Sequence, residues 1–263
     1  MGWSLLWIVF VACLVACSVG FKKFVWFMSI GYGLGVAAGG LAIACIFFGK
    51  MAWVNWLQML VFLLYGGRLA WFLWNRERSS ASYAKAMQGV SDKTVPMPVM
   101  VVMWLFMGAL YTMQVSPLFY RLYNGSTDVV VPLIGALISL CGALIEAEAD
   151  RQKSVWKKDH PNEVATQGMF KLSRCPNYFG ELTMWLGVFV GGLTTYKGFG
   201  QWCFAIVALI AIIIIMFDGA KRLETRQAKR YGDDAAYKAY CAKTPIILPF
   251  IPIYSLGGKK KEG

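Results

Sequence analysis

The sequence predicts an all-α polytopic membrane protein with seven transmembrane helices. Of its 263 residues, 58% are hydrophobic and 15% are charged, whereas a soluble domain of this size carries about 25% charged residues. The apolar residues form long blocks, and about 20 of them in a helix cross the hydrocarbon core of a bilayer. The blocks are too long for buried strands and lack the alternation of a membrane barrel. They comprise residues 3–20, 24–48, 51–74, 96–116, 129–147, 178–195 and 200–218.

The first block is predicted to be a membrane helix and not a secretory signal peptide. Its opening residues, Met1-Gly2-Trp3-Ser4, carry no charged side chain, and no small-residue cleavage pattern precedes Lys22. A signal peptide has a basic segment and such a cleavage site. The longest polar interval, residues 148–176, joins the fifth and sixth blocks, and a second polar stretch, residues 218–245, has helical character. The second stretch is predicted to lie along the membrane interface.

The basic residues predict the orientation of the helices. If seven helices alternate in direction, 22 of the 26 Lys and Arg residues fall on one side and three on the other, while Arg68 lies inside the third block. The side richer in Lys and Arg is normally cytosolic. The N-terminus is therefore predicted to face away from the cytosol and the C-terminus to face it. Topology and anionic headgroups account for the net charge of +12, so no nucleic-acid partner is predicted.

The cysteines and the one histidine predict neither a metal site nor a disulfide framework. Five of the seven cysteines lie in apolar blocks, no CxxC pair is present, and His160 is the single histidine. A zinc site needs closely spaced cysteines and histidines. We expect no bound metal.

Polar side chains near the membrane are the candidates for chemistry. Arg68 lies inside the third block, where a charge needs a cavity or a partner, or must extend to the headgroups. Glu146 and Asp150 are four residues apart and share a helix face. These two carboxylates can hold cations or hydrogen-bond donors, or simply pair with neighbouring Arg151 and Lys153.

Two further groups surround the last blocks. Pro176 can begin a helix, which places Asn177 and Glu181 on one face, with Glu181 a full turn inside. Alternatively, Glu181 only compensates the helix dipole. After the seventh block, Arg222 and Arg230 can bind phosphates, or only satisfy the positive-inside pattern.

The run Arg174-Cys175-Pro176-Asn177-Tyr178-Phe179-Gly180-Glu181 resembles the R-x-P-N-Y-x-G-E signature of the steroid 5-alpha-reductase family. It is most similar to the branch known as a domain of unknown function. Residues 146–153 resemble the family's acidic helix end, and residues 230–250 resemble its C-terminal signature. The clear similarity covers residues 140–250, and a weaker one covers residues 64–78.

The resemblance implies a membrane enzyme that uses NADPH to reduce a C=C bond of a steroid, an isoprenoid or another lipid. Tyr65 would be the catalytic proton donor, because a phenol can stabilise an oxyanion that grows during hydride addition. Glu146, Asp150, Asn177 and Glu181 would hold the nicotinamide-ribose end. Asn75, Arg76, Arg78, Lys157, Arg222 and Tyr231 would contact the phosphates and adenosine, and Arg68, Arg174 and Tyr178 complete the predicted cofactor-binding set.

Two other functions stay open. Steroid-reducing members pair the tyrosine with a glutamate from an N-terminal helix, whereas the first acidic residue of this chain is Glu77. The signature is also similar to the R-H-P-x-Y-x-G motif of isoprenylcysteine carboxyl methyltransferases, which implies S-adenosylmethionine as the alternative cofactor. A third possibility is a non-catalytic membrane protein that binds lipids.

By function, the chain is predicted to divide into three regions. Residues 1–95 hold three helices and a cytosolic loop on the substrate side, residues 96–250 hold four helices on the cofactor side, and residues 251–263 form a basic tail. Lys260 and Lys261 resemble a dilysine retrieval signal, although they equally suit a solubilising basic tail. The location is therefore predicted to be the endoplasmic reticulum in a eukaryote and the inner membrane in a bacterium.

Overall fold

The computed structural model describes residues 2–79 and 95–257, and each regular element in these ranges is helical. The predicted dilysine signal lies outside the described residues. Within them, six helical segments are long and apolar enough to cross a membrane. The chain is therefore a multi-pass integral membrane protein. The six segments are α1 (Gly2–Cys17) with η1 (Ser18–Phe21), η2 (Phe24–Phe27) with α2 (Ile30–Ile46), α3 (Trp53–Ser79), α5 (Met97–Tyr123), α6 (Val130–Asp159) and α8 (Gly198–Tyr231).

The predicted block at residues 178–195 corresponds to α7 (Pro176–Gly191), a helix of 16 residues. This is shorter than the roughly 20 residues that span a hydrocarbon core. A seventh span and the orientation of the helices stay predictions. The remaining elements are short: η3 (Phe48–Lys50), η4 (Gly168–Lys171) and α9 (Ala235–Lys243).

The chain forms two compact units that are each discontinuous in sequence. Unit 1 comprises residues 1–137 and 187–208, and unit 2 comprises residues 138–186 and 209–263. Unit 1 therefore holds α1, α2, α3 and α5, while unit 2 holds α9 and most of α6, α7 and α8. The division at residue 96, which was drawn by function, stays a prediction.

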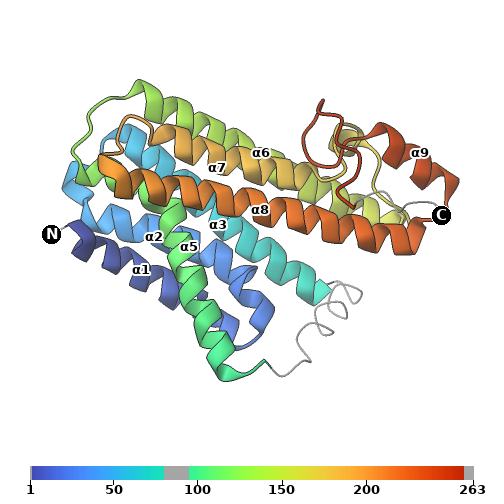
Figure 1. Ribbon diagram of the computed structural model, residues 1–263, viewed down its shortest axis with the longest axis horizontal. Coiled ribbons are helices and arrows are strands. Elements are labelled where there is room, and N and C mark those ends of the chain that lie inside the picture. The colour runs from blue at the N-terminus through green and yellow to red at the C-terminus, as the bar shows by residue number, and fades with distance from the viewer. Residues whose placement is uncertain (1, 80–94, 258–263) are drawn as a thin grey trace. The chain divides into compact units, whose positions relative to one another are not determined.

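In unit 1, α2 packs against α1, α3 and α5 (Figure 1). Glycines let α2 and α3 come unusually close. A Cβ atom added to Gly33 would lie 2.4 Å from the Gly66 carbonyl oxygen, and one added to Gly66 would lie 2.3 Å from the Gly33 carbonyl oxygen. Backbones approach this closely only where side chains are absent, a common device between membrane helices.

Helix α5 contains Pro117 in its interior. Proline lacks the amide hydrogen that would bond the carbonyl four residues earlier, which is that of Met113. The Ser116 hydroxyl donates a hydrogen bond to this carbonyl oxygen at 2.8 Å. Such a replacement is how membrane helices accommodate proline.

In unit 2, the polar ends of two long helices continue past their apolar parts without a break (Figure 1). Helices α6 and α8 have 30 and 34 residues, and at 1.5 Å per residue each is longer than the roughly 30 Å of a hydrocarbon core. The predicted helical character of residues 218–245 is confirmed by the end of α8 and by α9, whose first turn is capped by the Asp234 carboxylate. Whether this stretch lies along the interface stays a prediction. A small core of Cys175, Ala220, Ile246 and Ile247 joins α7, α8 and the C-terminal segment.

Candidate functional site

Unit 2 buries three carboxylates where α6 meets α7. Glu146 is 3% exposed and Asp150 is 6% exposed on α6, and Glu181 of α7 is 7% exposed. The two helices touch here, because a Cβ atom added to Gly180 would lie 2.5 Å from the Glu146 amide nitrogen. The expected shared face of Glu146 and Asp150 is thus a buried one. Each of the three acids has an interaction partner within the protein.

Arg174 lies directly before α7 and joins three parts of unit 2. Its guanidinium forms an ion pair with Glu224 of α8 at 3.2 Å and donates a hydrogen bond to the Cys241 sulfur of α9 at 3.1 Å. It also donates a hydrogen bond to the Tyr254 carbonyl oxygen. Although burial disfavours the charged form, Cys241 and Glu224 raise the pKa of Arg174 overall. Arg174 therefore stays charged and ties α7, α8, α9 and the C-terminal segment together.

Two neighbours of Arg174, Glu224 and Ser173, also bind the C-terminal segment, which comprises residues 244–257. The second carboxylate oxygen of Glu224 accepts hydrogen bonds from the amides of Leu256 and Gly257, at 3.0 and 3.2 Å. The Ser173 hydroxyl donates to the carbonyl oxygens of Ile246 and Ile247. Arg174, the first residue of the signature run, and Ser173 directly before it thus both organise the fold of unit 2.

Cys175, which stands next to Arg174, is buried. Burial raises the pKa of its thiol to about 11, and the charges of Lys153 and Arg174 offset this only in part. A thiol with so high a pKa is a poor nucleophile near neutral pH. Its position in the signature therefore indicates packing and not covalent chemistry.

A cluster of cations surrounds the Tyr231 ring at the end of α8. Lys157 of α6 donates a hydrogen bond to the Tyr231 hydroxyl at 3.1 Å, and its ammonium lies 5.5 Å from the ring centroid. The Arg230 guanidinium lies 5.3 Å from the same ring and donates to the Asn162 side-chain oxygen at 2.8 Å. Lys157 also donates to backbone carbonyl oxygens of Pro161 and Glu163. The predicted pair Lys157 and Tyr231 is therefore in direct contact.

The other predicted residues of unit 2 are more exposed. Arg222 has a side chain that is 67% exposed and forms an ion pair with Asp218 one turn earlier on α8, at 2.6 Å. Asn177 and Tyr178 are half-buried in the first turn of α7, and Tyr178 packs against the small core. The structure thus places the acids inside unit 2 and Arg222 on its surface.

The remaining predicted residues belong to α3 in unit 1. Tyr65 is buried, and its hydroxyl donates a hydrogen bond to the Tyr32 hydroxyl at 3.2 Å. Arg68 is half-buried and has a partner within the protein. At the end of the helix, Asn75 and Arg78 are exposed, whereas Arg76 is half-buried with its guanidinium 5.1 Å from the Phe72 ring. Arg78 lies 5.3 Å from the Trp74 ring.

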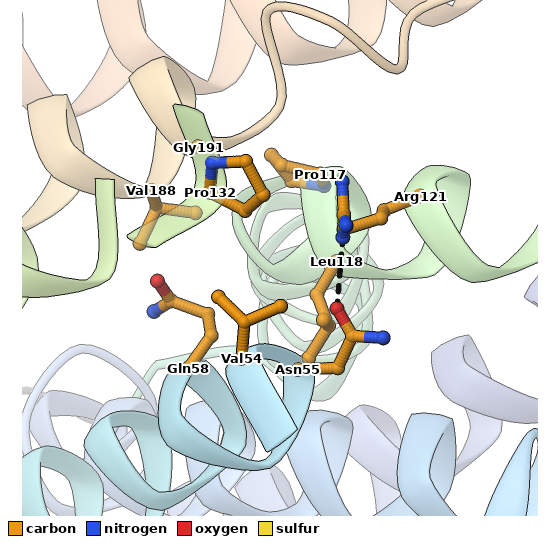
Figure 2. Close-up of a pocket in the computed structure, with 9 residues that line it drawn as sticks. All are labelled: Val54, Asn55, Gln58, Pro117, Leu118, Arg121, Pro132, Val188 and Gly191. Atoms are coloured by element: carbon orange, nitrogen blue, oxygen red, sulfur yellow. Dashed lines mark hydrogen bonds between the residues drawn. The ribbon is translucent and has the colours of Figure 1, made fainter. Parts of the chain in front are cut away.

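Unit 1 contains a small, mostly apolar cavity with three polar side chains in its lining, which the sequence did not predict. Figure 2 shows it between Asn55 and Gln58 of α3 and Arg121 of α5. Its volume is about 20 Å³, with apolar walls that include Val54 and Leu118, and a cavity of this size can hold a water molecule. The buried Gln58 amide nitrogen has no hydrogen-bond partner among the described residues.

Arg121 is held at the edge of this cavity by an ion pair. Its guanidinium donates to the Asn55 side-chain oxygen and to an Asp128 carboxylate oxygen, each at 2.8 Å. The other Asp128 oxygen accepts a hydrogen bond from Thr194 at 2.7 Å. Desolvation acts to raise the pKa of Asp128, but these hydrogen bonds and the Arg121 charge lower it overall. The pair therefore stays ionised and fixes the connection between α5 and α6.

Side chains that commonly bind metals do not gather within the described ranges. Within residues 2–79 and 95–257, no group of three His, Cys, Asp or Glu side chains is placed to hold a metal ion. The chemistry-bearing groups are carboxylates, guanidiniums and phenols. The fold is that of a multi-pass helical membrane protein, and its second unit buries three carboxylates.

The comparison with known families finds one match. A family model described as a protein of unknown function (DUF1295) matches residues 18–244. The chain belongs to the DUF1295 family. The expected similarity to a family of unknown function is thus confirmed. The match begins at residue 18, further toward the N-terminus than the motifs that carry the resemblance. No curated protein and no solved structure matches the chain.

Proposed function

We propose that this protein is an NADPH-dependent membrane oxidoreductase that reduces a C=C bond of a steroid, an isoprenoid or another lipid by hydride transfer. The observation that carries the proposal is the burial of Glu146, Asp150 and Glu181 at the contact between α6 and α7. The similarity of residues 174–181 to the reductase signature supplies the cofactor class.

Burying three ionisable groups in a membrane protein is costly, so such groups commonly mark a functional site. Ionised carboxylates accept hydrogen bonds only. Their natural ligands are donors such as ribose hydroxyls or the amide of a nicotinamide. Glu146, Asp150 and Glu181 therefore suit the sugar and amide end of a dinucleotide.

The same unit supplies cations for the anionic end of a dinucleotide. Lys157 and Arg230 flank the Tyr231 ring, and Arg222 extends from the surface of α8. Lys and Arg form charge-assisted hydrogen bonds to phosphates. The donor set thus fits NADPH, whose nicotinamide would supply the hydride.

Tyr65 is the proposed acid on the substrate side. As hydride adds to an enone, negative charge grows on the carbonyl oxygen, and a phenol hydroxyl can donate a hydrogen bond to it. Tyr65 is buried and donates its hydroxyl hydrogen to the Tyr32 hydroxyl, so in the proposed step the hydroxyl would turn from Tyr32 to the substrate oxygen. A dry, low-dielectric surrounding strengthens such a bond.

Cofactor binding is tested with the purified protein in lipid nanodiscs. NADPH should raise the unfolding temperature, since a ligand at 100 times its Kd stabilises a protein by about 2.7 kcal/mol. Glu181→Gln and Asp150→Asn should abolish the rise. Glu148→Gln is the matched control, because Glu148 lies on the same helix but pairs with Arg151 on the exposed face.

Three results would contradict the proposal. Stabilisation by S-adenosylmethionine alone would indicate a methyltransferase, and no shift with either cofactor would indicate a non-catalytic lipid-binding protein. Loss of NADPH binding in the Glu148→Gln control as well would show that the acids act only through general charge. For the substrate side, Tyr65→Phe should keep NADPH binding and stop NADPH oxidation with an enone steroid such as progesterone.

A further inference from the structure

The turn at residues 248–253 presents a bare aromatic ring to its surroundings. Phe250 is 88% exposed, and Ile251 beside it is 46% exposed. The turn is not part of any of the six apolar spans. Contact with water is unfavourable for a phenylalanine ring, so the exposure of Phe250 outside the apolar spans calls for a physical reason.

The backbone holds this ring out in a rare conformation. Phe250 has a φ of +67°, which residues with a Cβ atom seldom adopt. Pro249 precedes Phe250 and Pro252 follows Ile251 in the sequence, and each proline restricts the backbone. Hydrogen bonds close the turn, from the Ile253 amide to the Ile251 carbonyl oxygen at 2.7 Å and from the Ile246 amide to the Ile253 carbonyl oxygen at 2.8 Å. A rare conformation that is held in place is a reason to look for function.

The base of the turn packs against one level of α8. Leu248 and Ile253 pack against the small core that contains Ala220, and so does Phe217. At this level the apolar run of α8 ends, because Asp218 and Lys221 follow Phe217. The change from apolar to charged residues marks where hydrocarbon gives way to headgroups. The turn therefore packs against α8 where the sequence of this helix changes from apolar to charged.

We propose that the turn at residues 248–253 is an interfacial membrane anchor, in which Phe250 and Ile251 insert among the lipid headgroups and the adjoining acyl chains. Aromatic and aliphatic side chains favour this region, and basic residues beside them bind anionic headgroups. Lys221 and Arg222 lie exposed on α8 near the base of the turn. The anchor would fix the polar body of unit 2 to the membrane surface. It requires no cofactor and stands apart from the proposed reductase activity.

The proposal is tested by photocrosslinking to lipid. The photoreactive aromatic residue p-benzoylphenylalanine replaces Phe250 in the full-length protein, in nanodiscs of phosphatidylcholine and phosphatidylglycerol. Ile214, which is 61% exposed in the apolar part of α8, is the lipid-facing control. Lys229, an exposed residue 12 positions after Phe217, is the water-facing control, because 12 residues of helix rise about 18 Å.

We expect position 250 to form lipid adducts at a yield similar to that of position 214. Burial of a phenylalanine ring favours the inserted state by tenfold or more, so the yield should be at least about ten times that of position 229. The same replacement at Ile251 is a second, independent site with the same expected result. Adducts at position 214 without adducts at positions 250 and 251 would overturn the proposal. So would crosslinks from these positions to a second copy of the chain.

Discussion

Replacing Arg174 with methionine tests how strongly unit 2 depends on one buried guanidinium. The change removes the ion pair with Glu224, the hydrogen bond to Cys241 and the hydrogen bond to the Tyr254 carbonyl oxygen. Methionine has a similar length and no charge, so it fills much of the same space. The partner carboxylate then stays in a mostly buried position, because its side chain is only 15% exposed.

Breaking a buried ion pair by removing one partner costs about 3–5 kcal/mol. Glu224 keeps its hydrogen bonds from the amides of Leu256 and Gly257, so we expect the lower end, about 3 kcal/mol. For a protein of this size, 1 kcal/mol shifts the unfolding temperature by about 2–4 °C. The Arg174→Met variant should therefore unfold roughly 6–12 °C below the wild type.

The assay is thermal unfolding in detergent, and its readout is the fraction of the protein that remains monodisperse after heating. Arg222→Met is the matched control, because its ion pair with Asp218 is on α8 but mostly exposed. Exposed ion pairs contribute little, so this variant should unfold at the wild-type temperature. The double variant Arg174→Met with Glu224→Gln should recover part of the loss, because no unpaired charge stays buried.

An unchanged unfolding temperature in Arg174→Met would refute the reasoning. It would mean that the guanidinium does not hold the C-terminal segment. The single variants Arg174→Met and Glu224→Gln supply a second check. If the loss in the double variant equals the sum of their two losses, the reasoning is refuted too, because partners in one ion pair are coupled.

Three further changes test other parts of the structure. Gly66→Ala places a methyl group 2.3 Å from the Gly33 carbonyl oxygen and should lower the stability in thermal unfolding by about 1–3 kcal/mol. Its control is Gly67→Ala, which has nothing within 4 Å of the added methyl group and should be neutral or stabilising by up to about 1 kcal/mol. Equal effects of the two substitutions would contradict the close approach of α2 and α3. The pKa of Asp128 is lowered from 3.8, so its stabilising contribution is complete above that value and is lost as pH falls through the lower pKa of the folded state. Stability measured across acidic pH should therefore fall less steeply in Asp128→Asn, and an unchanged pH profile would argue against the ion pair. Cys175, buried with a pKa of about 11, should react with maleimide only after unfolding, and mass spectrometry showing modification of the folded protein at neutral pH would contradict its burial.

The sequence predicted those parts of the fold that depend on neighbours along the chain. Six of the seven predicted spans follow from long apolar runs, since each run forms its own helix. The shared face of Glu146 and Asp150 was also predictable, because residues four apart lie on one side of a helix, but the burial of that face was not. In the same way, the polar stretch after Phe217 was correctly expected to be helical.

The contacts of Arg174 could not be predicted from local pattern. Its partners Glu224, Cys241 and Tyr254 lie 50, 67 and 80 residues away in the sequence. Helical periodicity says nothing about which distant side chains meet. The resemblance to the reductase signature assigned Arg174 to cofactor binding, and that role stays a prediction beside its observed structural one.

The cavity of unit 1 and the ion pair at its edge were missed for a related reason. Arg121 is one of the three basic residues predicted to face away from the cytosol, and no role was predicted for Asp128. Their spacing of seven residues across a helix end was a usable signal, because opposite charges there can meet. The third partner, Asn55, lies 66 residues away, and no pattern in its own segment marks it.

The reciprocal contact between Gly33 and Gly66 has a consequence for how the family can vary. Each glycine sits against the other's carbonyl group, so neither position can gain a side chain while the two helices keep their separation. A relative that carries a larger residue at one of them must have moved α2 and α3 apart. Among homologues, a side chain gained at either site should therefore be accompanied by a wider separation of these two helices.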